Sequence, residues 1–441
     1  MGNYRSGKLS FGNLSSGKLT FWDTVVLGNF LLGKILWEST LGNSTSGILS
    51  NIAISLCFSA DNFPGLCNHQ AGLMNGLFIF INDKIIALIY SQVVLSLLGK
   101  NGDINAVLRY KERYESEEKL TVLMTAAKKG QNTLIKSLLE QGAEVNQKKE
   151  TETGNEEECD KVNANTALAF AAENGAVEVV NTLIEHGADV KQEGELSLLL
   201  AASDGYDEIV QMLIEKGADV NFVEPKSENT ALTLAAADGN NKSVLTLIEH
   251  GADVNHQNKK QRTPLIMAVT EGGNIDVIRT LLKHNAEKDT KDEDCYSALI
   301  YAVISMSSDY VSLLLEHGAG MTKFYYDGKE ETCLSWAAAC GDNDIVTALI
   351  KHGADVNFAN EENETALSNA AKGGYIECVE KLLEYGAKVD IGNPVAAAVD
   401  GGNIKIAAIL LKHGACNIER NLDEDPLLTK AILEMSFKGK D

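Results

Sequence analysis

The chain has 441 residues, a formal net charge of −23 and 44% hydrophobic residues. The acidic excess lies after residue 100, because residues 1–100 carry six Lys and Arg against four Asp and Glu. A surface of that charge repels phosphate backbones, which argues against nucleic acid as a direct partner and favours a protein with a basic surface. Solubility alone is the alternative explanation of the acidity.

Residues 1–84 differ in composition and pattern from the rest of the chain. Short near-repeats rich in Gly, Ser and Asn, such as residues 6–11 and 16–21, lack a periodic apolar face, so we expect a poorly ordered N-terminal segment. Residues 12–18 nearly complete a phosphate-binding loop, but Leu19 stands where Ser or Thr would hold magnesium. We therefore expect no cofactor. An enzyme with its catalytic part in residues 1–100 is the least favoured function.

The first six residues fit the pattern for N-myristoylation at Gly2, with Arg5 nearby. A chance match is the competing interpretation, and one acyl chain binds membranes only weakly. No sustained apolar core follows the start, so no signal peptide is expected. This motif supports an alternative function, a membrane-tethered recruiter.

The most apolar stretch runs from Leu77 to Leu98. Asp83 and Lys84 interrupt it, and the 14 residues from position 85 to 98 are too few to cross a bilayer core of ~30 Å. We expect no transmembrane span and interpret this stretch as a hydrophobic capping helix. A second helix around residues 102–108 would make residues 85–117 a degenerate N-terminal repeat.

Between residues 118 and 420 one sequence motif recurs with a period of about 33 residues. Each copy opens with a pattern such as Thr-Ala-Leu, continues through Ala-Ala and a glycine, and closes with an apolar run and a second glycine. The apolar residues of the run have helical spacing, so each copy has a greasy face that only a neighbouring copy can cover. Nine copies open at Thr121, Thr166, Leu196, Thr230, Thr263, Ser297, Thr332, Thr365 and Asn393.

These copies resemble the ankyrin repeat, whose usual opening is Thr-Pro-Leu-His. The resemblance implies an all-α solenoid of helix-turn-helix repeats with β-hairpin fingers, followed by a C-terminal cap and tail over residues 421–441. The Thr-Ala-Leu openings are also similar to those of the multiple-ankyrin, single-KH-domain proteins, but no KH module follows and no RNA role is carried over. The family's histidine is missing from every opening, which predicts looser fingers.

The histidines and cysteines do not indicate a metal site. Six histidines precede the closing turn in successive copies, where each can cap helical carbonyls, so they form a row and not a metal cluster. The eight cysteines contain no C-x-x-C pair, which favours a reducing compartment. We expect a cytoplasmic protein, with the nucleus as the other location.

Specificity is expected at the finger tips, because loops on a rigid scaffold usually carry function. The expected function is a non-catalytic protein-binding scaffold or adaptor that holds its partner on the concave face. The tyrosines among the candidates have an alternative role, packing on the adjacent finger, and Trp336 is expected to fill the space between two helices. The candidate contact residues are Arg262, Tyr296, Tyr325, Tyr326, Glu331 and Glu362.

Overall fold

The computed structural model of the protein describes residues 104–105, 107–110, 118–149, 164–191 and 194–415. Several sequence predictions lie outside these residues. They are the N-terminal segment with Gly2, the apolar stretch and the C-terminal tail.

The described residues form nine helix pairs, as the repeat count predicts. The first helices are short and rich in alanine: α4 (Val122–Lys128), α6 (Ala167–Glu173), α8 (Gly194–Ser203), α10 (Ala231–Ala237), α12 (Pro264–Thr270), α14 (Ala298–Ile304), α16 (Cys333–Cys340), α18 (Ala366–Gly373) and α20 (Pro394–Asp400). The second helices are α5 (Asn132–Glu140), α7 (Val177–Glu185), α9 (Asp207–Glu215), α11 (Asn241–Glu249), α13 (Ile275–Lys283), α15 (Ser308–Glu316), α17 (Asn343–Lys351), α19 (Ile376–Glu384) and α21 (Ile404–Lys412).

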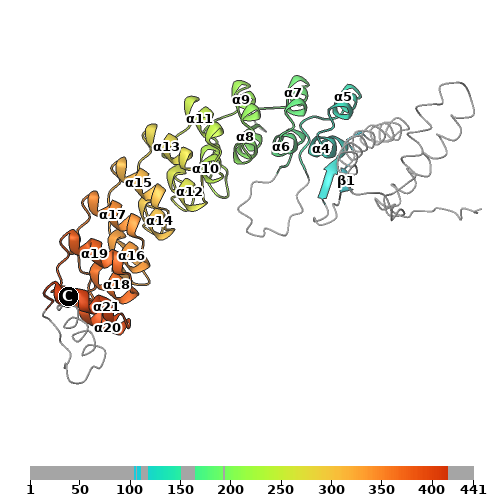
Figure 1. Ribbon diagram of the computed structural model, residues 1–441. Helices are drawn as coiled ribbons and strands as arrows, with labels where there is room; N and C mark the ends of the chain where they lie inside the picture. The colour runs from blue at the N-terminus through green and yellow to red at the C-terminus, as the bar shows by residue number, and fades with distance from the viewer. Residues whose placement is uncertain (1–103, 106, 111–117, 150–163, 192–193, 416–441) are drawn as a thin grey trace, which may run out of the picture. The chain divides into compact units, whose positions relative to one another are not determined.

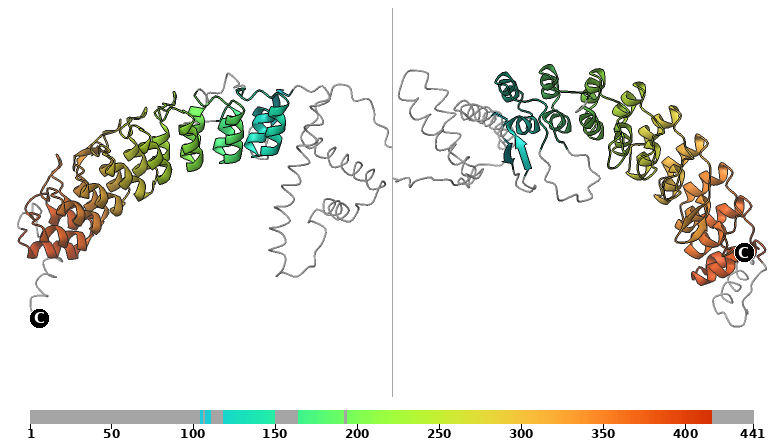
Figure 2. Two further views of the ribbon diagram at one scale, coloured as in Figure 1. Left: turned by 90° about the horizontal axis from the view of Figure 1, so that it is seen from above. Right: turned by 180° about the vertical axis from the view of Figure 1, so that it is seen from behind.

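The helices form two rows, with first helices against first helices and second against second (Figure 1). The same order of pairs is visible from two further directions (Figure 2). Small side chains such as Ala235 and Ala236, both fully buried, let neighbouring first helices approach closely. Val244 and Leu247 of α11 are also fully buried, so each pair contributes apolar surface to a core shared with its neighbours.

Threonine determines where most first helices begin. In six of them the threonine that opens the repeat accepts a hydrogen bond from the backbone N–H three residues later. In three copies the residue at the position of the family's histidine completes a capping box with that threonine. These residues are Thr233, Ser335 and Ser368.

Glycine at the turns has a positive φ in nearly every copy, as in Gly239 at 76° and Gly251 at 88°. Two copies adopt the same backbone without glycine. Met306 replaces the turn glycine at φ 56°, and Asn285 replaces the closing glycine at φ 63°. The backbone geometry of the repeat is therefore kept even where the sequence departs from it.

The described strands form two antiparallel pairs. Strand β1 (Val107–Tyr110) pairs with β2 (Glu118–Thr121), and β3 (Phe324–Tyr326) pairs with β4 (Lys329–Glu331). The helix predicted around residues 102–108 is wrong at its second half, because residues 107–110 are rich in strand-forming side chains and pair with β2. Among the described residues no helix is both long and apolar enough to cross a bilayer.

Candidate protein-binding surface

Hydrogen bonds join successive fingers, although the family's opening histidine is absent. The side chain of Asn258 donates to that of Asn229 at 2.9 Å, and the backbone N–H of Lys259 donates to the carbonyl of Ser227 at 3.0 Å. One finger further on, the N–H of Glu293 donates to the carbonyl of Lys260 at 3.1 Å. Hydrogen bonds between these fingers are therefore present without the histidine.

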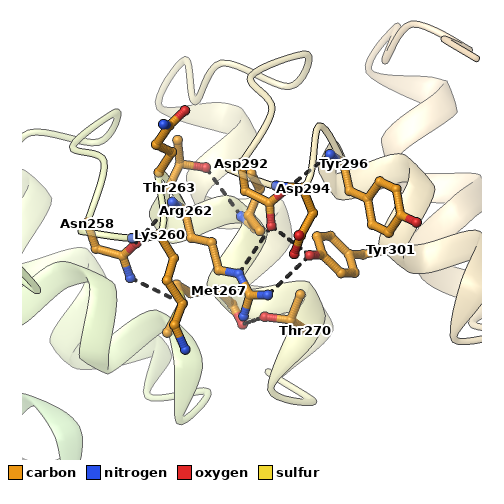
Figure 3. A network of polar contacts seen from close by, with 12 residues as sticks. Asn258, Lys260, Arg262, Thr263, Met267, Thr270, Asp292, Asp294, Tyr296 and Tyr301 are labelled. Atoms are coloured by element: carbon orange, nitrogen blue, oxygen red, sulfur yellow. Dashed lines mark hydrogen bonds and ion pairs between the residues drawn. The ribbon is translucent and has the colours of Figure 1, made fainter. Parts of the chain in front are cut away.

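Arg262 lies at the base of this row and binds the following finger (Figure 3). Its Nε is 3.2 Å from a carboxylate oxygen of Asp292, whose side chain is fully buried, and its guanidinium donates to the Tyr301 hydroxyl at 3.1 Å. The Tyr301 hydroxyl donates in turn to Asp292 at 2.6 Å. Burial, together with this bond to a carboxylate, raises the pKa of Tyr301. Arg262 thus makes intramolecular contacts that link two neighbouring repeats.

The other oxygen of Asp292 shapes its own finger tip. It accepts the backbone N–H groups of Asp294 and Tyr296, each at 3.1 Å. A charged acceptor at this position fixes the turn and the direction in which Tyr296 leaves it. The ion pair between Arg262 and Asp292 and the turn at the finger tip are therefore parts of one network.

Aromatic rings continue the network towards the next finger. The ring centroid of Tyr296 lies 5.4 Å from that of Tyr301 and 5.7 Å from that of Phe324, in edge-to-face arrangements. The Tyr296 hydroxyl donates to the carbonyl of Tyr325 at 2.8 Å. Tyr296 consequently packs on the adjacent finger and supports the β3–β4 hairpin.

Two tyrosines of that hairpin face solvent. Tyr325 is 62% exposed, more than any other large hydrophobic side chain in the described part of the chain. Tyr326 is 46% exposed, and its ring lies 4.5 Å from Trp336 of α16. The ring centroid of Trp336 also lies 6.2 Å from that of Phe324, so this ring supports the hairpin.

Carboxylates surround the hairpin on the side of the next finger. The ammonium of Lys329 forms ion pairs with Glu362 and, at 3.4 Å, with Glu364. Glu331 is half-buried and accepts a hydrogen bond from the Ser335 hydroxyl. Burial raises the pKa of Glu331, and the nearby charges of Glu364 and Glu362 raise it further.

The structure thus gathers five of the six candidate contact residues around one hairpin, with Arg262 two fingers away. Sequence inspection missed the residues that position them, because a lone Asp or Phe in a finger looks like any other. Only the Asp-Gly pair between Phe-Tyr-Tyr and Lys-Glu-Glu signals a hairpin here. The missed residues are Asp292, Tyr301, Phe324, Lys329 and Glu364.

The histidines cap helices as predicted. In five of the six the ring Nδ1 lies 2.8–2.9 Å from the carbonyl four residues earlier, at the end of a second helix. They are His186, His250, His317, His352 and His413. Within the described ranges no group of three or more His, Cys, Asp and Glu could hold a metal ion.

A family model for ankyrin repeats, which spans three copies of the repeat, matches the chain in overlapping segments. The matched segments are residues 85–194, 123–224, 198–292, 232–324, 287–360 and 320–393. Together with the nine stacked helix pairs, this match shows that the chain belongs to the ankyrin repeat family. No curated protein matches the chain.

Proposed function

We propose that this protein is a non-catalytic scaffold or adaptor that binds a protein partner on the face formed by its fingers and first helices, the concave face of ankyrin stacks. Ankyrin repeats are protein-interaction modules, and repeat stacks bind partners over extended surfaces. One observation supports this choice of face. Tyr325 is 62% exposed on the β3–β4 hairpin, whose backbone is held by a hydrogen bond from Tyr296.

Two features of the hairpin support a contact role for Tyr325 and Tyr326. Exposed tyrosine offers a large amphipathic contact area at a small entropic cost, and it is enriched among residues that dominate binding energy. The bond from the Tyr296 hydroxyl to the Tyr325 carbonyl holds the backbone of β3, so little ordering remains to be done on binding. Arg262 enters this function as a positioning residue.

Site-directed photocross-linking in cells tests the choice of face. A benzophenone amino acid replaces Tyr325 in one variant and Leu245 in a second, since Leu245 is 39% exposed but lies on a second helix, α11. We expect discrete protein adducts from position 325 and none of the same mass from position 245. Adducts of equal yield at both positions would count against a finger-face interface.

The location that fits this function is the cytoplasm. The described cysteines Cys295, Cys333, Cys340 and Cys378 are all free thiols. Burial raises the pKa of Cys333 to about 12 and that of Cys378 to about 11, which keeps both protonated at neutral pH. Acylation of Gly2 would add a membrane tether, and the intact mass of protein made in a eukaryotic cell decides whether it occurs.

A further inference from the structure

One face of the β3–β4 hairpin combines an exposed ring with carboxylates. Residues directly opposite each other in an antiparallel pair share a face, and here Tyr326 is opposite Lys329 while Phe324 is opposite Glu331. We call these four residues the Tyr326 face. Its floor is Trp336, whose ring packs against Tyr326 and Phe324.

The charges beside the Tyr326 face do not balance. Three carboxylates, those of Glu331, Glu362 and Glu364, gather around the single ammonium of Lys329. The Glu362 side chain is 56% exposed and that of Glu364 29%, so both are accessible to a partner. The surplus is a local negative charge next to an aromatic ring that solvent can reach.

Two other cations of this stack lie close to both an aromatic ring and a carboxylate. The guanidinium carbon of Arg262 lies 5.4 Å from one ring centroid, and its Nε lies 3.2 Å from a carboxylate oxygen. The ammonium of Lys323 lies 4.1 Å from another ring centroid and 3.3 Å from a carboxylate oxygen. Both rings attract the cation through their negative faces. The two groups are Arg262 with Tyr301 and Asp292, and Lys323 with Phe358 and Glu330.

We propose that the Tyr326 face, with Glu362 and Glu364, binds an arginine side chain on an extended segment of the protein partner. Guanidinium fits this arrangement better than ammonium because it is planar, weakly hydrated, stacks on aromatic rings and pairs with carboxylates through two hydrogen bonds. The arginine adds the positive charge that the three carboxylates lack. This inference rests on the proposed function and specifies the chemistry of the partner.

Peptide binding at fixed, low ionic strength tests the proposal. The probe is a fluorescent Gly/Ser peptide with a short run of arginines, and lysine or citrulline replaces arginine in matched peptides. We expect the arginine peptide to bind best and the citrulline peptide, which is uncharged, to bind worst. Equal binding of arginine and citrulline peptides would overturn the proposal.

Variants locate the binding site. The double change Glu362→Gln with Glu364→Gln should weaken the arginine peptide about tenfold, whereas Glu178→Gln with Glu208→Gln, which removes the same charge from exposed positions on α7 and α9, should change it less than about twofold. Tyr326→Leu should weaken arginine more than lysine. Equal losses in the two double variants would show general attraction to an acidic surface and would overturn the proposal.

A variant that is expected to strengthen binding distinguishes the proposal from simple disruption of the hairpin. Lys329→Met removes the internal cation, so the three carboxylates should bind the arginine peptide several-fold more tightly. Weaker binding by this variant would contradict the proposal. Failure of every peptide arm together with specific adducts at position 325 would reject the arginine inference and leave the finger-face function standing.

Discussion

At the scale of single residues, two positions of the stack carry a free-energy cost. Met306 adopts a left-handed backbone that glycine adopts in most other copies, and its side chain is 37% exposed. Glu331 keeps a carboxylate half-buried beside two others. The first cost is steric, since Cβ crowds the backbone at positive φ, and the second is electrostatic.

Met306→Gly should raise the free energy of unfolding by about 0.5–1 kcal/mol, because relief of the left-handed strain exceeds the added flexibility of the unfolded chain. Urea denaturation measures the difference. The adjacent Ser305→Gly is the control, since Ser305 is exposed with an ordinary φ of −78° and should gain nothing. A gain at Ser305 equal to that at Met306 would refute the explanation by strain.

Glu331→Gln should raise the free energy of unfolding at pH 7. The folded state raises the pKa of Glu331 above its ordinary value of 4.5, so folding favours the protonated form, and stability falls as pH rises from below 4.5 through the folded pKa. The glutamine oxygen still accepts from Ser335, but it does not ionise. The advantage should vanish below pH 4.5, and an equal advantage on both sides of that pH would contradict the assignment.

At the scale of elements, neighbouring helix pairs share their core. Leu247 of α11 is fully buried, whereas Leu245 of the same helix is 39% exposed. Helix α11 packs against α9 and α13, the second helices of the copies on either side. Loss of packing at Leu247 should therefore be felt in three copies.

Leu247→Ala should lower the free energy of unfolding by roughly 2–5 kcal/mol, while Leu245→Ala should change it by about 0.5 kcal/mol or less. Hydrogen exchange followed by mass spectrometry shows where the effect spreads. We expect weaker protection in α9 and α13 as well as α11. Loss of protection restricted to residues of the one repeat would argue against coupled repeats.

The sequence predicted the repeat elements well because their causes are local. Spacing of apolar residues, threonine at a helix start and glycine at a turn each act within about ten residues. The network at the candidate surface has another origin. Arg262 meets Asp292 and Tyr301 across two repeats, 30 and 39 residues away, and no short-range pattern marks such partners. The strand at residues 107–110 was also missed, because it is defined by its pairing with residues 118–121 and not by the spacing of its own apolar residues.

At the scale of the whole molecule, the proposed function treats the stack of helix pairs as a support for finger tips that differ from copy to copy. The buried cores are nearly the same in every repeat, so they carry no information about a partner. We propose that the tips carry it, above all the β3–β4 hairpin with its exposed tyrosines. Recognition should therefore depend on a few aromatic anchors, with the surrounding charges steering encounter.

The affinity of the partner identified by cross-linking tests this account most directly. The double change Tyr325→Ala with Tyr326→Ala should weaken binding by about 1–4 kcal/mol, as measured by titration calorimetry, with the helical circular dichroism unchanged. Ile376→Ala with Tyr385→Ala, two exposed apolar positions on and next to α19, is the matched control and should leave the affinity nearly unchanged. Undiminished binding by the tyrosine variant, with binding lost on removal of residues 1–84, would contradict the account by moving the interface outside the ankyrin stack.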